Sequence, residues 1–308
     1  MRKHYEEVHL CKKISCPICG IKIKRLTPHL NNHYNKDKKT NFFKCISFYN
    51  SSVNNSNIIY NNEKQIICED EDIYYKIINN YKKDIIKYNG EFISFKSFTI
   101  GEGTHCRFLF GLNKKSKKPV SIKLYKDKLS PNFIKEIDMM NKLKKYNIFP
   151  KVIDFKENIN EAFISESLLG IDLIRLLEFE NNSFDNITIL NIAKDVLECL
   201  SFIHKENISH CDIKGDNLIW NIFSEKNIKS KIILIDFSCS VKSNDKSLYK
   251  KIGSNFYSSL NQNLKNIPNE NDEIESLIYT LLDLLNIDSP WNVDGIENRE
   301  EQKKNIYI

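Results

Sequence analysis

The stretch His210–Leu218 reads HCDIKGDNL, and its polar residues follow the pattern H-x-D-x-K-x-x-N. A second stretch, KIILIDF, places Asp236 nineteen residues after Asn217. The apolar residues at 218–222 and 231–235 predict short strands between the two polar groups. A charged surface turn would account for H-x-D alone. It does not account for two carboxylates, a lysine and an amide in this order and spacing.

The first stretch resembles the catalytic loop of a protein kinase, and the second resembles the metal-binding D-F-G turn of the same family. The resemblance implies that Asp212 holds the attacking hydroxyl as a base and that Lys214 offsets charge on the moving phosphoryl group. It also implies that Asn217 and Asp236 hold magnesium. Lys214, two residues after the base, points by resemblance to the serine/threonine class.

A glycine-containing turn precedes these stretches and resembles the glycine-rich loop that covers the phosphates of ATP. Its residues are Ile100, Gly101, Glu102, Gly103, Thr104, His105, Cys106, Arg107 and Phe108. Cys106 replaces the third glycine of the family pattern. The resemblance extends to Lys123, which would hold the α- and β-phosphates, and to its helix partner Glu136.

Two further segments complete the resemblance. The segment around Glu166 and Leu168 resembles the hinge that binds adenine through its backbone. The segment Gly253–Asn261 reads GSNFYSSLN and resembles the activation-segment end of the casein kinase I group, which includes the vaccinia-related kinases. In such kinases an aspartate at a helix start braces the catalytic loop, and Asp272 matches it. Cys211 replaces an arginine that grips a phosphorylated activation loop, so we expect activity without that phosphorylation.

Hydrophobic periodicity gives the expected elements. Strands are expected at 92–100, 108–112 and 120–125, and helices at 130–145, 189–205 and 272–285. A further helix is expected at about 70–87. The apolar stripe of the 189–205 helix is Ile192, Val196, Cys199 and Ile203. The stripe of the 272–285 helix is Ile274, Leu277, Ile278, Leu281 and Leu285.

The expected fold is therefore α+β and bilobal, with a small antiparallel sheet in the N-lobe and a mainly helical C-lobe. The chain stops about seventeen residues after Trp291, so a shortened C-lobe is expected. The expected domains are a zinc-finger module at 1–40, a linker with a helix at 41–90 and a kinase domain at 91–308. The expected function is ATP-dependent serine/threonine protein phosphorylation. Two alternatives stay open: a nucleotide-binding pseudokinase scaffold, suggested by Cys106, Ser238 and the short C-lobe, and a small-molecule phosphotransferase.

Residues 1–50 hold eleven Lys/Arg and three Asp/Glu, a net charge of +8, whereas the remaining chain has 35 basic and 37 acidic residues. Cys16, Cys19, His29 and His33 in this basic segment form C-x2-C-x9-H-x3-H. Two thiolates and two imidazoles at such spacing favour a tetrahedral zinc site, with a gap like that of short-loop C2H2 fingers of Ros-type regulators. Incidental residues are the alternative. The basic finger would bind nucleic acid or a protein partner.

The nine cysteines are an odd number, and the polar N-terminal residues do not resemble a signal peptide. The longest apolar stretch, Leu277–Ile287, is interrupted by Asp283 and is far shorter than the ~18 residues of a membrane span. We therefore expect an intracellular protein, cytoplasmic or nuclear, that is neither secreted nor membrane-bound. ATP, Mg²⁺ and Zn²⁺ are the expected cofactors, and a protein carrying Ser or Thr is the expected substrate.

Overall fold

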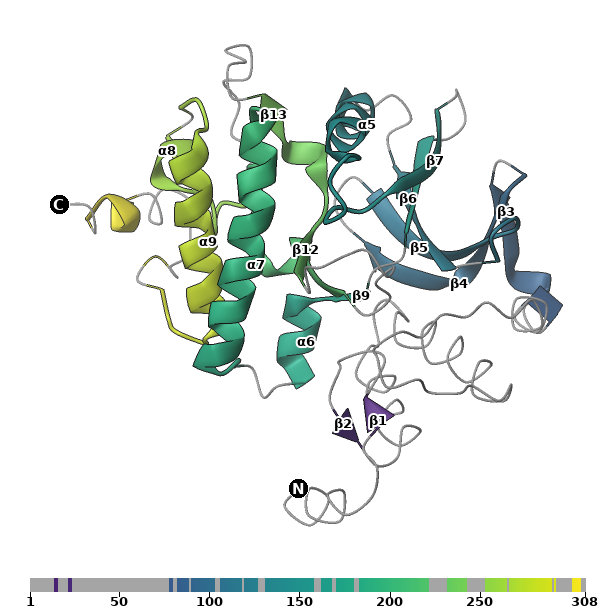
Figure 1. Cartoon of the computed structure of the whole chain (residues 1–308), viewed down its shortest axis with the longest axis horizontal. Coiled ribbons are helices and arrows are strands. Elements are labelled where there is room, and N and C mark those ends of the chain that lie inside the picture. The colour runs from purple at the N-terminus through teal and green to yellow at the C-terminus, as the bar shows by residue number, and fades with distance from the viewer. Residues whose placement is uncertain are drawn as a thin grey trace. The chain divides into compact units, whose positions relative to one another are not determined.

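In the computed structural model the chain forms two compact units. Figure 1 shows the helices and strands of the described residues. Unit 1 takes in Met1–Ser130, Val152–Gly170 and Ile222–Lys226, and unit 2 takes in the remainder. The structure describes residues 78–79, 82–88, 90–102, 106–117, 119–126, 131–157, 162–167, 170–179, 183–221, 232–242, 253–264, 266–289, 291 and 301–305, with the backbone of 14–15 and 22–23.

Unit 1 is built on a six-stranded antiparallel sheet in the order β3-β4-β5-β6-β8-β7. The strands are β3 (Ile85–Tyr88), β4 (Phe92–Glu102), β5 (Cys106–Asn113), β6 (Pro119–Tyr125), β7 (Val152–Glu157) and β8 (Ala162–Ser167). Each expected strand of this region is present. The sheet and the helix-rich second unit agree with the expected α+β class.

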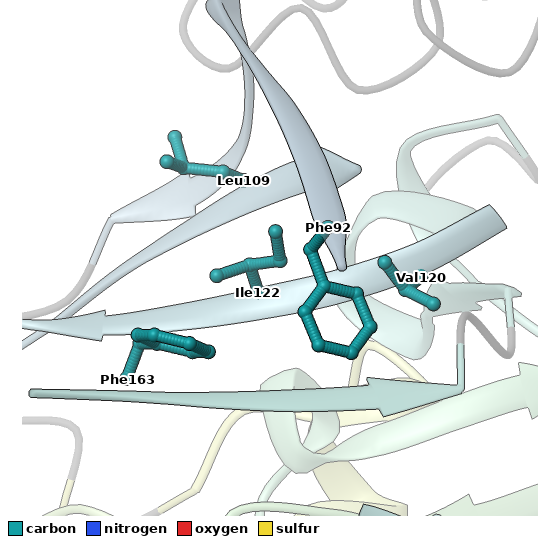
Figure 2. Close-up of a cluster of buried hydrophobic side chains, with 5 residues drawn as sticks. All are labelled: Phe92, Leu109, Val120, Ile122 and Phe163. Carbon is teal, nitrogen blue, oxygen red and sulfur yellow. The ribbon is translucent and has the colours of Figure 1, made fainter. Parts of the chain in front are cut away.

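One face of this sheet carries a compact apolar cluster (Figure 2). Its members are Phe92, Leu109, Val120, Ile122 and Phe163. They come from four neighbouring strands, and each is almost completely buried. Because side chains alternate across a strand, the residues next to Ile122 point to the opposite face of the sheet. Lys123 is one of them, so the packing of Ile122 fixes the direction of a lysine that the sequence singles out.

The expected helix at 70–87 does not continue to its predicted end. Residues Ile85–Tyr88 form β3, which pairs with β4 from Ile85 opposite Phe95 to Tyr88 opposite Phe92. Ile85, Ile86 and Tyr88 favour extended backbone because they are β-branched or aromatic, and pairing with β4 satisfies their backbone groups. The sheet therefore begins within the stretch that the sequence interpretation assigned to a linker.

Unit 2 is mainly helical. Its helices are α5 (Pro131–Leu143), α6 (Leu173–Phe179), α7 (Asn186–Lys205), α8 (Leu260–Asn263) and α9 (Glu270–Leu284). Its short strands are β9 (Gly170–Asp172, whose first residue belongs to unit 1), β10 (Ile208–Ser209), β11 (Leu218–Asn221), β12 (Ile232–Leu234) and β13 (Val241–Lys242). They form a β12-β11-β9 sheet and a β10-β13 pair. The long helices α7 and α9 lie side by side (Figure 1).

The helix α7 matches its sequence pattern closely. Asp185 caps its N-terminus by accepting hydrogen bonds from the backbone N–H groups of Ile187 and Thr188, both at 2.9 Å. The predicted stripe is buried at every position, namely Ile192, Val196, Cys199 and Ile203. The helix therefore supplies an apolar wall of unit 2.

The helix α9 lies within two residues of the predicted bounds, 272–285, but has a different buried face. Ile278 is 51% exposed and Ile274 is 37% exposed, so the predicted apolar stripe is wrong at these positions. The buried face instead carries polar residues, including Glu273, Ser276 and Thr280. The physical reason is that this face meets backbone segments whose N–H and C=O groups require hydrogen-bond partners.

At the N-terminal end, the backbone of β1 (Ile14–Ser15) pairs with that of β2 (Lys22–Ile23) in an antiparallel register. Among the residues that the structure describes, no helix is long and apolar enough to cross a membrane.

Candidate active site

The hairpin of β11 and β12 brings the two predicted metal-binding residues together. Leu218 pairs with Leu234, so Asn217 directly precedes the paired end of one strand and Asp236 follows that of the other. The backbone N–H of Ile235 donates to the carbonyl of Asn217 at 3.0 Å, which closes this end of the hairpin. The strand pairing thus places Asn217 and Asp236 at the same end of the hairpin.

Asp212 lies at the centre of a hydrogen-bonded cluster and is only 8% exposed. The amide Nδ2 of Asn217 donates to its carboxylate at 3.0 Å and to its carbonyl at 2.8 Å. The ammonium of Lys214 lies 2.8 Å from the same carboxylate oxygen. The other oxygen accepts the backbone N–H of Ser254 at 2.9 Å. Asp212, Lys214 and Asn217 are therefore assembled as predicted, with one carboxylate held from several sides.

Electrostatic effects link Lys214 to both predicted aspartates. Burial alone would lower the pKa of Lys214, but the charge and the hydrogen bond of Asp212 raise it above its usual value. The negative charges of Asp216 and Asp236 act in the same direction on this pKa. Lys214 is consequently a cation whose ammonium lies directly against the Asp212 carboxylate.

Asp236 has a left-handed backbone with φ of 65°. Its side chain accepts hydrogen bonds from the hydroxyl of Ser238 at 2.6 Å and from the Ser238 N–H at 3.3 Å. The serine that replaces the glycine of D-F-G therefore orients the carboxylate and leaves its charge unchanged.

The residues present fit a magnesium ion. Both Nδ2 hydrogen bonds of Asn217 go to Asp212, which fixes the amide orientation and leaves its oxygen as an acceptor. Asp236 supplies carboxylate oxygen, and oxygen donors are what magnesium prefers. When bound, the ion would supply positive charge for the phosphate groups.

The catalytic loop is held in a strained conformation by a glutamate. Cys211 has a φ of 67°, which is uncommon for a residue with a Cβ. The carboxylate of Glu273 on α9 accepts the backbone N–H groups of His210 and of Cys211, the latter at 3.1 Å. The carbonyl of Ile213 further along the loop accepts from the hydroxyl of Thr280 at 3.2 Å. The polar face of α9 is therefore the support of the loop.

This geometry corrects the role expected for Asp272. Its oxygens accept from Ser259 Oγ at 2.6 Å, Asn261 Nδ2 at 2.9 Å and the Asn269 N–H at 2.7 Å. Asp272 thus ties the end of the activation segment to the start of α9, and Glu273 braces the catalytic loop. Successive residues of a helix point in directions that differ by about 100°. Glu273 therefore faces the catalytic loop, whereas Asp272 faces the end of the activation segment.

His210 connects the loop to the core of unit 2. Its Nε2 lies 2.9 Å from the carbonyl of Ile235, which can only accept, so this nitrogen carries the proton. The His210 ring packs edge-on against Phe237, and Phe237 in turn packs against Phe149. This aromatic contact fixes the segment that carries Asp236.

Cys211 itself is buried, and its thiol donates to the carbonyl of Ser209 at 3.6 Å. Burial raises the pKa of this thiol well above its usual value. The side chain is therefore uncharged and cannot grip a phosphate, although independence from loop phosphorylation stays a prediction.

In unit 1, the predicted nucleotide-binding residues occupy one row of the sheet. Gly101 on β4 pairs with Phe108 on β5, Phe108 pairs with Lys123 on β6, and Lys123 pairs with Ile164 on β8. Lys123 is 2% exposed, and its ammonium lies 5.5 Å from the Phe108 ring and 5.4 Å from the Tyr125 ring. The lysine is thus desolvated and held against aromatic faces.

The remaining predicted residues divide into three groups. Ile100 and Glu102 lie in β4, Cys106 and Arg107 lie in β5, and Glu166 lies in β8. Glu136 is buried on α5 in unit 2, and its ion pair with Lys123 stays a prediction. The third group lies outside the described residues and consists of Gly103, Thr104, His105, Leu168, Cys16, Cys19, His29 and His33. Among the residues that the structure describes, no group of His, Cys, Asp and Glu forms a metal-binding cluster.

Sequence reasoning missed Glu273, the N–H of Ser254 and Gln262. Gln262 Nε2 donates to the carbonyl of Cys211 at 3.3 Å and so links the activation segment to the catalytic loop. No sequence signal marks a backbone N–H. A polar residue on the inner face of a predicted helix was the available signal for Glu273, but Asp272 beside it was chosen.

The comparisons agree with this geometry. The family model described as protein kinase domain matches residues 96–306, which is more than half of the chain. The chain therefore belongs to the protein kinase family, whose members use ATP and Mg²⁺.

Two curated proteins illustrate the similarity. Dual specificity tyrosine-phosphorylation-regulated kinase 2 of Drosophila melanogaster is 26% identical over 242 residues, covering 75% of this chain and 29% of that protein. Dual specificity tyrosine-phosphorylation-regulated kinase 4 of Homo sapiens is 27% identical over 202 residues, covering 62% of this chain and 36% of that protein. The chain thus spans about a third of the length of these relatives.

Proposed function

We propose that this chain is an active protein kinase that transfers the γ-phosphate of ATP to serine and threonine hydroxyls of protein substrates. The observation that supports it most strongly is the cluster around Asp212. A carboxylate held by Asn217, Lys214 and the Ser254 N–H is preorganised to orient a hydroxyl and accept its proton. The Lys214 cation beside it offsets negative charge on the transferred group.

The pseudokinase scaffold is the alternative, and the structure gives a reason to rank it second. Of the replacements that suggest it, Ser238 hydrogen-bonds Asp236 and leaves its charge in place. Cys106 is buried at the start of β5, and its replacement of a glycine removes no charged group. Each charged residue that phosphoryl transfer needs is retained in the chain.

The amino acids that accept the phosphate distinguish a serine/threonine kinase from a dual-specificity kinase. The names of the relatives above describe dual-specificity enzymes, whereas Lys214 and the GSNFYSSLN segment favour the serine/threonine class and a casein kinase I-like subgroup. The test is transfer from γ-labelled ATP to generic protein acceptors, followed by analysis of the labelled amino acids. We expect phosphoserine and phosphothreonine. Labelled tyrosine would make the enzyme dual-specific, and no transfer to any acceptor would favour the scaffold.

We further propose that Cys16, Cys19, His29 and His33 bind one zinc ion in a finger that recruits nucleic acid or a protein partner. The paired backbones of β1 and β2 support this proposal, since they flank residues 16–21, the segment with the C-x2-C motif. The net charge of +8 in residues 1–50 favours an anionic partner.

A further inference from the structure

Lys303 is a lysine with a completely buried side chain in the helical residues 301–305 of unit 2. Its ammonium donates to the backbone carbonyls of Asn255 at 3.4 Å, Phe256 at 3.0 Å and Ser258 at 2.5 Å. A buried ammonium is costly unless its donors are satisfied. Here all three acceptors come from one turn at the end of the activation segment, so the lysine caps that turn.

Two aromatic rings complete the environment of this cation. Its Nζ lies 4.8 Å from the centre of the Tyr279 ring and 5.5 Å from that of Trp291. The two rings pack against each other at 4.2 Å. The faces of aromatic rings attract cations, and attract them more strongly where water is excluded. Tyr279 belongs to α9, so Lys303 joins the turn at 255–258 to the helix that braces the catalytic loop.

The capped turn is connected to the catalytic carboxylate. The carbonyl of Ser254 accepts from the N–H of Ser258 at 2.8 Å and from its hydroxyl at 2.7 Å. The N–H of the same Ser254 donates to Asp212 at 2.9 Å. Gly253, with a φ of 88°, packs so closely on the carbonyl of Cys211 that a Cβ would collide with it. A shift of this turn would therefore move the groups that hold Asp212.

We propose that Lys303 is a positioning residue for phosphoryl transfer, which acts through the turn at 254–258 on Asp212 and thereby on the substrate hydroxyl that Asp212 orients. The kinetic part of this proposal rests on the proposed kinase function. Because Lys303 binds three backbone carbonyls, its effect depends on the cation and not on the side chains of residues 255–258.

The test compares Lys303→Met with Lys304→Met in the full chain. Methionine keeps most of the length of the buried side chain but has neither charge nor donors, and Lys304 is an exposed neighbour that loses the same charge. For Lys303→Met we expect kcat/KM for a peptide to fall about 10- to 100-fold, the equivalent of one lost charge-assisted hydrogen bond. The peptide KM should rise while the KM for ATP stays unchanged. A smaller folded fraction would lower the apparent kcat and leave both KM values unaltered.

A second measurement is independent of catalysis. Hydrogen exchange at the amides of 254–258 should be faster in Lys303→Met than in Lys304→Met, with unchanged exchange in α7. If Lys303→Met does not fold, Lys303→Arg, which keeps the cation in a planar group, should show the same changes at smaller size. Unchanged exchange at 254–258, or an unchanged peptide KM in an active enzyme, would overturn the proposal. Absence of transfer in wild type and Lys304→Met alike would count against the kinase function, and the exchange comparison would still decide the role of Lys303.

Discussion

At the scale of single residues, the catalytic loop depends on the buried carboxylate of Glu273, which lies outside the loop's own H-x-D-x-K-x-x-N motif. Cys211 is held at a φ of 67°, and such a conformation costs on the order of 1–2 kcal/mol for a residue with a Cβ. Glu273 offsets this cost because one carboxylate oxygen accepts the N–H groups of His210 and Cys211. Its other oxygen contacts His204 on α7.

We predict that Glu273→Gln lowers the free energy of unfolding by about 1–3 kcal/mol, the cost of weakening buried charge-assisted hydrogen bonds. It should also lower kcat, since the loop that carries Asp212 loses its support. Urea unfolding and a peptide assay would measure both effects. Glu270→Gln is the matched control, because Glu270 faces the same histidine from an exposed position and should change neither value appreciably. Equal effects of the two substitutions would contradict the bracing role.

The motif residues and their supports differ in how far the sequence could predict them. Asp212, Lys214 and Asn217 were predictable because the chemistry fixes their types and their spacing along one short loop. Glu273 and Lys303 were not, because they act on backbone N–H and C=O groups that every residue possesses. Only the fold decides which backbone groups they meet.

At the scale of elements, α9 shows why a hydrophobic pattern found the helix but misplaced its inner face. The approximate bounds followed from apolar residues at helical spacing, although the Asn269 cap starts the helix two residues before the predicted position 272. The inner face then had to serve the catalytic loop, so polar residues are buried and Ile278 is exposed. The inner face of α7 is apolar, and all four stripe residues predicted for it are buried.

The contact between α7 and α9 predicts a pH dependence of stability. Burial would lower the pKa of His204, but the hydrogen bond and charge of Glu273, with the charge of Glu270, raise it above the usual value of about 6.5. A raised folded-state pKa means that the pair stabilises fully below the unfolded pKa and that this stabilisation is lost as pH rises through the folded value. His204→Gln should therefore cost more stability at about pH 6 than at about pH 8.5. Urea unfolding at both pH values would check it, and a cost independent of pH would show that His204 acts only by packing.

At the scale of the whole molecule, the sequence separates a basic Cys/His segment from the kinase motifs, and the family match begins only at residue 96. The two-unit division agrees with the predicted sheet-rich and helical parts. The entry of β3 into the sheet was not predicted, because four residues are too few to give a period and only pairing with β4 identifies them as a strand.

The proposed zinc finger, as a module distinct from the kinase domain, predicts that zinc binding and catalysis are independent. One zinc per chain should be found by metal analysis, and Cys16→Ser with Cys19→Ser should abolish it. The matched control, Cys11→Ser with Cys45→Ser, should retain zinc. Transfer to a short peptide should be nearly unchanged in both double variants, while binding to a large anionic partner should weaken only in the first and fall steeply with salt. Loss of peptide transfer together with zinc would show that the finger is structurally part of the kinase domain.

The central claim is that the Asp212 cluster performs phosphoryl transfer, and Asp212→Asn tests it most directly. Asparagine keeps the shape but cannot accept a proton, and its amide would face the donors that now hold the carboxylate. We expect transfer from γ-labelled ATP to fall ~10²-fold or more, the scale of a lost acid/base group, while ATP still binds. Asp216→Asn, which removes an exposed charge from the same loop, should retain most activity. An Asp212→Asn enzyme as active as wild type would contradict the account, and equally negligible transfer by both would favour the scaffold.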